Sequence, residues 1–184
     1  MNFVRGKAVE EFEINGESVI FRYPKIEDVR DCMKVINSIV DEDHYILKLN
    51  KVSLKEERKW LEKQIEKMEN DQMIRLHVEV EGKVMGGADV NRKQKEGQSH
   101  IAEVGISLRK EIRDEGIEKK KKKKICEIAK NELGIEIARI SYIDGNERAK
   151  YLYEKLGFKE IGVFPKSRKI NDSYDDEILM YKEL

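Results

Sequence analysis

The sequence has 184 residues, enough for one domain with a buried core and too few for two domains of ordinary size. Its 37 basic and 37 acidic side chains give zero formal charge, which offers no support for a nucleic-acid or acidic-membrane partner. The two cysteines lie too far apart in sequence for a metal pair or a disulfide framework, so no metal is expected. No apolar run approaches the ~20 residues that cross a bilayer, and residues 1–10 lack a signal-peptide pattern, so a single cytoplasmic domain, 1–184, is expected.

The N-terminal segment is predicted to form a β-hairpin. Asn15-Gly16 supplies the positive φ angles of a two-residue turn between strands at Glu11–Ile14 and Ser18–Tyr23. Beyond this hairpin, apolar residues recur three or four positions apart and predict an amphipathic helix. These residues are Ile26, Val29, Met33, Ile36 and Val40.

A polar segment, Asp41–Lys51, separates this helix from the next one. Ser53 and Glu56 match the pattern of a capping box, which predicts the start of a second helix. The apolar side chains that continue this helix are Trp60, Leu61, Ile65 and Met68.

Alternating apolar residues then predict two strands, Met73–Val80 and Val84–Val90. The second strand contains the pair Gly86-Gly87. Paired glycines inside a strand indicate a bulge, or a close approach by another backbone or a ligand.

The centre of the chain combines a strand, a turn and a helix. Val104, Ile106 and Leu108 give the strand pattern, and a segment with helical spacing follows and ends at Gly134. A strand that turns directly into a helix aims free backbone N–H groups at one point, where a phosphate is attracted. By itself the pattern is a weak indication, because many α/β connections have this form.

The remainder predicts a strand at Ile135–Ile143, a helix ended by Gly157, and two last strands at Phe158–Phe164 and Ile178–Tyr181. A charged loop, Pro165–Glu177, is expected to join these last strands. Hairpins favour antiparallel neighbours and strand–helix–strand units favour parallel ones. The fold class is therefore α/β, with a mixed, mostly antiparallel central sheet flanked by four helices.

This order of elements, together with two motifs, resembles the GNAT superfamily of acetyl-CoA-dependent N-acetyltransferases. The family's phosphate turn, Arg/Gln-x-x-Gly-x-Gly/Ala, is matched by residues 113–118 except at its final small residue. A second and more specific pattern, Asn-x-x-Ala-x-x-x-Tyr-x-x-x-Gly-Phe, is matched in full. The matching residues are Asn146, Ala149, Tyr153, Gly157 and Phe158. The resemblance covers nearly the whole chain from Ile20 onward and implies a GNAT-like acyl-CoA N-acyltransferase fold.

The resemblance implies that acetyl-CoA is the co-substrate. Backbone groups of Ile106, Ser107 and Leu108 are expected to hold its pantetheine arm. The turn and the first helical residues are expected to bind its pyrophosphate. These residues are Arg113, Asp114, Glu115, Gly116, Ile117, Glu118 and Lys119.

Acetyl transfer to an amine needs a positioned thioester, a route for the amine's proton and a proton donor for the departing thiolate. By resemblance, Tyr153 stands where the family commonly keeps its general acid, and Asn146 lies nearby on the cofactor side. Glu103 occupies a region where many members carry a carboxylate that acts as base, often through water. A core tyrosine and a surface cross-strand partner are the structural alternatives for Tyr153 and Glu103.

Two departures from the family pattern concern the phosphate turn and its helix. Glu118 replaces the small residue and brings a carboxylate near phosphate charges, where repulsion is unfavourable. Lys119–Lys124 sweeps through more than a full helical turn, so some lysines face the side that the family keeps apolar. Three interpretations stay open: counter-charges for the CoA phosphates, a degenerate member that binds CoA weakly, or positions altered from a parent sequence. A nucleic-acid surface is disfavoured, because the lysines have no interleaved aromatics and have acidic neighbours.

The sequence thus favours an N-acetyltransferase that moves acetyl directly to a primary amine in a ternary complex. No acyl-enzyme is expected, because no cysteine lies on the central strand or turn. The acceptor is open among a protein N-terminus, a lysine, a polyamine and another small amine, with Asp41–Leu47 and Pro165–Glu177 forming its pocket. The alternative is a non-catalytic or weakened acyl-CoA-binding regulatory module. A monomer and a homodimer paired through the C-terminal edge strand are both open.

Overall fold

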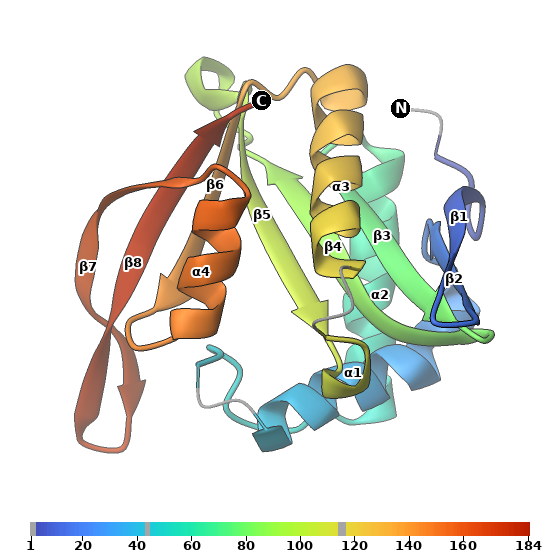
Figure 1. Ribbon diagram of the computed structural model, residues 1–184, viewed down its shortest axis with the longest axis horizontal. Coiled ribbons are helices and arrows are strands. Elements are labelled where there is room, and N and C mark those ends of the chain that lie inside the picture. The colour runs from blue at the N-terminus through green and yellow to red at the C-terminus, as the bar shows by residue number, and fades with distance from the viewer. Residues whose placement is uncertain (1–2, 43–44, 114–116) are drawn as a thin grey trace.

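The computed structural model describes residues 3–42, 45–113 and 117–184, and within 118–123 only the backbone. One eight-stranded sheet runs through the molecule in the order β1-β2-β3-β4-β5-β6-β8-β7 (Figure 1). Its strands are β1 (Ala8–Ile14), β2 (Glu17–Arg22), β3 (Met73–Val80), β4 (Lys83–Arg92), β5 (Ile101–Leu108), β6 (Ile137–Ile143), β7 (Lys159–Ile170) and β8 (Ser173–Glu183). The helices are α1 (Val29–Glu42), α2 (Leu54–Glu69), α3 (Ile117–Leu133) and α4 (Glu147–Lys155). Neighbouring strands are antiparallel except β5 and β6, which confirms the mixed, mostly antiparallel sheet.

Helices cover both faces of the sheet. In Figure 1, α3 and α4 lie on the near face and α2 lies behind the sheet. The main core lies between α3 and the strands, where Ile125 and Ala129 are fully buried. A smaller apolar cluster joins α1 to α2 and consists of Val29, Cys32, Leu61 and Ile65.

Short-range signals in the N-terminal half predict their elements correctly. Asn15 and Gly16 have φ angles of 54° and 85°, the two positive values of the predicted turn. At the start of α2, the Glu56 N–H donates to Ser53 Oγ at 3.3 Å, and the Ser53 N–H donates to Glu56 Oε2 at 2.7 Å. Each of these contacts lies within three residues, so the sequence alone determines it.

The amphipathic helix predicted from the apolar stripe is confirmed as α1, although only Val29 among its stripe residues is buried, while Met33, Ile36 and Val40 are partly buried. The buried apolar positions are Val29, Cys32, Val35 and Ile39. The apolar residues of α1 cover an arc wider than one stripe, and packing against α2 and the sheet selects the part that is buried. Ile36, a member of the predicted stripe, instead lines two cavities.

The sheet splits between β5 and β6. The ladder between these strands covers three residue pairs, Ile101–Ile137, Ala102–Ala138 and Glu103–Arg139, and ends there. On its other edge β5 stays paired with β4 as far as Gly86–Leu108. The second half of β5 therefore leaves β6, and Figure 1 shows the two strands diverging toward α4 and the α1 side.

The C-terminal strands are longer than predicted. Residues 165–177, expected as a charged loop, are the distal half of a hairpin in which β7 runs to Ile170 and β8 starts at Ser173. Asn171, with a φ of 53°, lies in the turn between them. Most β7 side chains are exposed, so charged residues occupy both of its faces and no apolar alternation marks the strand. We call residues 165–177 the β7–β8 arm.

Candidate active site

A first cavity, of about 320 Å³, lies in the split between β5 and β6. We call it the split cavity. Its walls come from β5, from α1 and α4, and from the α1–α2 loop, residues 45–53. The lining side chains include Ile106, Ser107, Leu108, Arg113, Asn146 and Tyr153. Six of the residues predicted to hold acetyl-CoA therefore line one cavity.

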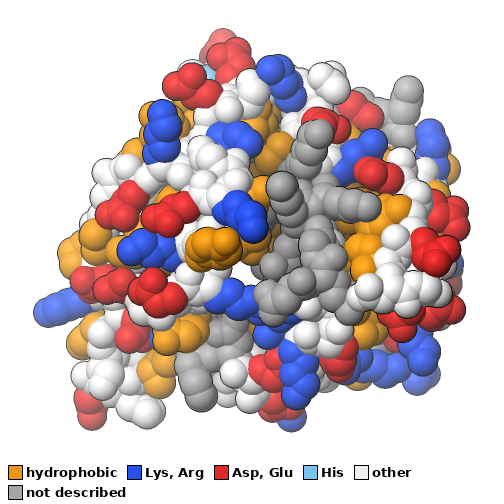
Figure 2. Space-filling model, in the orientation of Figure 1, with side chains coloured by type: hydrophobic (Ala, Val, Ile, Leu, Met, Phe, Trp, Pro, Cys, Tyr) orange, Lys and Arg blue, Asp and Glu red, His pale blue; other side chains and the backbone are white. Residues whose placement is uncertain are grey.

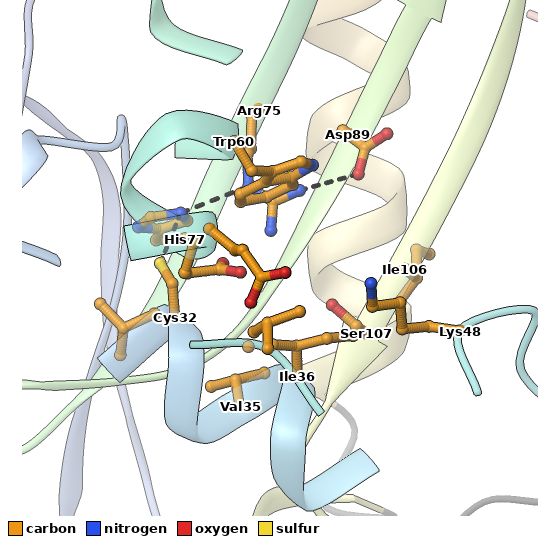
Figure 3. Close-up of a pocket in the computed structure, with 15 residues that line it drawn as sticks. Cys32, Val35, Ile36, Lys48, Trp60, Arg75, His77, Asp89, Ile106 and Ser107 are labelled. Carbon is orange, nitrogen blue, oxygen red and sulfur yellow. Dashed lines mark hydrogen bonds and ion pairs between the residues drawn. The ribbon is translucent and has the colours of Figure 1, made fainter. Parts of the chain in front are cut away.

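A second cavity, of about 450 Å³, lies on the other side of the strand, between the two N-terminal helices and β3–β5 (Figure 3). We call it the helix cavity. Its polar lining comes mainly from α2, β3 and β4, and includes Glu57, Arg75, His77 and Asp89. Ile36, Lys48, Ile106 and Ser107 line both this cavity and the split cavity. The two cavities consequently meet at the second half of β5.

Two glycines of β4 allow neighbouring groups to approach this strand closely. A Cβ at Gly86 would lie 2.5 Å from the Ser107 carbonyl oxygen and 2.5 Å from a Leu108 methyl carbon. A Cβ at Gly87 would lie 2.9 Å from the Arg75 guanidinium. The close approach predicted for Gly86-Gly87 is thus confirmed: one glycine accommodates the β5 backbone, and the other accommodates Arg75.

A chain of polar contacts forms the base of the helix cavity. The His77 Nδ1–H donates to Asp28 Oδ2 at 2.9 Å, and His77 Nε2 accepts from Arg75 Nε–H at 3.3 Å, a tautomer assigned from these partners. Arg75 also donates to Asp89 Oδ1 at 2.9 Å, and its guanidinium lies 4.6 Å from the Trp60 ring centroid. Figure 3 shows Trp60 stacked on Arg75, with dashed lines to His77 and Asp89.

The charges of this chain follow from burial. Burial lowers the pKa of His77 to about 4, so its ring is neutral at pH 7. Burial alone would raise the pKa of Asp28, but hydrogen bonds from His77 and Arg22 outweigh it and hold that pKa well below its usual range. The base of the cavity is therefore a paired network around an ionised Asp28 and a neutral imidazole.

The α1–α2 loop is braced by the β7–β8 arm. Arg168 is buried, and one of its nitrogens donates to the Ile46 carbonyl oxygen at 3.2 Å. Its other nitrogens lie 2.8 and 2.9 Å from Asp175 Oδ2, across the hairpin. Because residues 46–48 line the split cavity, this contact links the arm to the cavity wall. Of the two segments predicted to form the acceptor pocket, the first supplies Ile46 and Leu47 to the split cavity, whereas no residue of 165–177 lines the split or the helix cavity. Residues 43 and 44 of the first segment are outside the described part of the chain.

The structure places Tyr153 and Asn146 on α4, facing the split cavity. The Tyr153 ring is half-buried and lies 6.0 Å from the Tyr142 ring, nearly edge to face. Asn146 is the N-cap of α4, and its Oδ1 accepts from the Ala149 N–H at 3.1 Å. The matched motif therefore has a structural role in starting α4 as well as a position at the cavity.

The predicted phosphate turn is described only in part. Arg113 donates from Nε to the Leu108 carbonyl oxygen at 2.8 Å and lies 3.3 Å from Glu42. Ile117 is the first residue of α3, and its side chain is buried in an apolar cluster. Predicted turn residues Asp114, Glu115 and Gly116 lie outside the described residues. For Glu118 and Lys119 the structure describes only backbone, in the first turn of α3.

Glu103 lies apart from both cavities. It is exposed on β5, and its carboxylate is 2.6 Å from Lys93 Nζ. It lines a third hollow beside β6 and the β7–β8 arm, together with Arg139 and Glu177. The structure brings Tyr153 and Asn146 together but does not bring Glu103 to them.

Several residues of the helix cavity were not identified from sequence. Arg75 and His77 alternate with Ile74, Leu76 and Val78 in a strand, a pattern that could have indicated a polar face directed at a site. Glu57 precedes Leu61 by four positions, so it shares the buried face of α2. Cys32 of α1 also lines this cavity, although it is not on the central strand or turn.

A family model for the acetyltransferase (GNAT) domain matches residues 18–159, more than three quarters of the chain. The chain belongs to the GNAT acetyltransferase family. Membership implies acyl transfer from acetyl-CoA to an amine. No curated protein sequence matches the chain significantly.

Solved structures of GNAT proteins share the fold. A ribosomal-protein-alanine N-acetyltransferase from Brucella melitensis has 23% identity and a TM-score of 0.78, over 89% of this chain and 99% of that one. The acetyltransferase yncA from Salmonella typhimurium, solved with acetyl-CoA, has 17% identity and a TM-score of 0.77, over 90% and 94%. RimL, a ribosomal L7/L12 α-N-protein acetyltransferase solved with coenzyme A, has 13% identity and a TM-score of 0.81, over 95% and 98%.

No helix in the described ranges has both the length and the apolar composition that a membrane span requires. Over the same residues, no three His, Cys, Asp or Glu side chains are grouped so as to hold a metal ion. On the face in Figure 2, acidic and basic side chains of the described residues are interspersed rather than gathered into one basic patch.

Proposed function

We propose that this protein, acting as a single domain, transfers acetyl from acetyl-CoA directly to a primary amine within a ternary complex. The observation that carries this proposal is the meeting of two cavities at one half-strand, Ile106–Leu108. A donor thioester in the split cavity and an acceptor amine in the helix cavity would approach each other there. Such alignment supplies much of the rate increase of a two-substrate reaction.

The split cavity fits the donor. The edge of β5 that faces away from β4 loses its β6 partner after Glu103, so it is directed toward the cavity, as a pantetheine amide would require. α3 has 17 residues, and its N-terminus follows the turn that starts at Arg113. A helix N-terminus favours phosphate charge. In this proposal, backbone groups of residues 106–108 bind the pantetheine arm, and those of residues 113–119 bind the pyrophosphate.

Tyr153 is proposed as the general acid that protonates the departing CoA thiolate, with Asn146 fixing the start of the helix that carries it. Glu103 remains the proposed base. Because Glu103 lies outside both cavities, its proton route would run through water, as the family resemblance also implies.

Direct transfer is favoured over an acyl-enzyme. Cys32 lines the helix cavity, but burial raises the pKa of its thiol to about 12. A thiol of this kind is almost wholly protonated at pH 7 and is a poor nucleophile. We therefore assign Cys32 to the cavity wall and not to the chemistry.

Two measurements test the proposal. Calorimetric titration with acetyl-CoA should give a micromolar dissociation constant, about −8 kcal/mol, and amine-dependent release of CoA should follow. Tyr153→Phe should lower kcat roughly a hundredfold and leave acetyl-CoA affinity unchanged. Tyr151→Phe, an exposed tyrosine on the same helix, is the matched control.

The results separate the alternatives. Binding of acetyl-CoA without turnover on any amine would favour the non-catalytic acyl-CoA-binding module. Absence of acetyl-CoA binding would indicate a defective donor site, where Glu118 departs from the family pattern. Turnover that is unchanged by Tyr153→Phe would remove Tyr153 as the general acid.

A further inference from the structure

In the described part of the chain, one carboxylate of the helix cavity makes neither a side-chain hydrogen bond nor an ion pair. Glu57 projects from the first turn of α2, lines the cavity and is only 5% exposed. Among the described residues, its carboxylate makes no side-chain hydrogen bond and has no cation within ion-pair distance. Buried polar groups are ordinarily hydrogen-bonded. No Glu57 oxygen is among the fully enclosed side-chain atoms of the described residues that lack a hydrogen bond, so the carboxylate is open to the cavity, where a ligand can reach it.

The other charged groups around the cavity are already engaged. Arg75 is paired with Asp89 and contacts His77, and it acts on Glu57 through its charge without a hydrogen bond or ion pair between the two. Glu56 accepts from the Ser53 backbone and hydroxyl at 2.7 Å in the capping box. Burial raises the pKa of Glu57, and the nearby positive charges of Arg75 and Lys48 offset this effect only in part.

We infer that Glu57 recognises a second positive group on the acceptor, so that the helix cavity selects amines that carry an additional ammonium or guanidinium. The inference rests on the proposed function for the assignment of this cavity to the acceptor. The volume of about 450 Å³ suits a small ligand or the side chain of a larger one. An arriving cation would supply the hydrogen-bond donors that Glu57 lacks, while Trp60 forms an apolar wall for the carbon chain between the two groups.

Lys48 is the internal competitor for this role. It lies on the exposed α1–α2 loop, lines the same cavity and lowers the pKa of Glu57 through its charge, without reaching ion-pair distance. If the Lys48 ammonium satisfies Glu57 in solution, an acceptor cation would have to displace it. Lys48→Met should then raise the affinity for a dication, whereas Glu57→Gln should lower it.

The test compares two probes that differ by one ammonium group. 1,4-Diaminobutane and n-butylamine are titrated by calorimetry into the protein with CoA present. The wild type should prefer the diamine by roughly tenfold or more, and Glu57→Gln should remove this preference. Glu62→Gln, which changes an exposed carboxylate of the same helix, should keep it. Thermal unfolding of each variant establishes that the fold is retained.

Equal binding of both probes by the wild type, or an unchanged preference in Glu57→Gln, would overturn the inference. Release of CoA is measured on the same samples. A Glu57-dependent diamine preference without acetyl transfer would uphold the recognition site and overturn the proposed function. Acetylation of amines without any diamine preference would uphold the proposed function and overturn the recognition site.

Discussion

Acid is expected to destabilise this protein through one buried histidine. His77 is fully buried in β3, and its neutral ring donates to Asp28 and accepts from Arg75. Its pKa is about 4 in the folded protein, against an ordinary value of 6.5. Between these two values the unfolded chain binds a proton that the folded protein does not. Stability is therefore fully present above about pH 6.5 and is lost as the pH falls toward 4.

The size of the effect follows from the pKa difference. About 2.5 pKa units correspond to roughly 3 kcal/mol of unfolding free energy. That is a substantial part of the 5–15 kcal/mol by which ordinary domains are stable. Asp28 adds its own loss only at lower pH, because its folded pKa lies well below its usual range. The two groups thus act in separate pH windows.

Urea unfolding of the wild type and of His77→Asn, measured between about pH 7.5 and pH 4.5, tests this reasoning. His77→Asn should be less stable at neutral pH, because contacts are lost, but its stability should fall less steeply with acid. His100→Asn is the control and should keep the wild-type slope. A variant that lacks His77 yet keeps that slope would refute the assignment, as would NMR evidence that the His77 ring titrates near pH 6.5.

Two further substitutions address the cavity walls. Gly86→Ala should destabilise the fold by about 1–3 kcal/mol and weaken acetyl-CoA binding, because its Cβ would meet the Ser107 backbone; unfolding and calorimetry measure both. Gly97→Ala, where a Cβ meets nothing within 4 Å, should be nearly neutral, and equal effects of the two would contradict the packing argument. Arg168→Gln should weaken acetyl-CoA binding severalfold, because it removes the hydrogen bond that braces Ile46 in the wall of the split cavity. An unchanged acetyl-CoA affinity in calorimetry would exclude a role for the β7–β8 arm in positioning that loop.

The sequence by itself determined the features that depend on a few neighbouring residues. Asn15-Gly16 dictates its turn because positive φ angles are needed there, and Ser53 with Glu56 starts α2 because both capping partners lie within one helical turn. The order of strands and helices and the Asn146–Phe158 motif also predicted the GNAT family correctly. Each of these signals is local, or is a pattern that can be read along the chain.

Only the tertiary structure decided which faces are buried and which side chains meet. The β7–β8 arm gave no strand signal, because a hairpin exposed on both faces has no apolar alternation. The apolar residues of α1 span a wide arc, so more than one face of the helix could have been buried. Packing against α2 and the sheet left Ile36 at the two cavities. Glu57, His77 and Arg75 come together only because α2 crosses behind β3, a long-range arrangement that no spacing along the sequence encodes. The helix cavity is for this reason a property of the fold, although every residue that lines it is visible in the sequence.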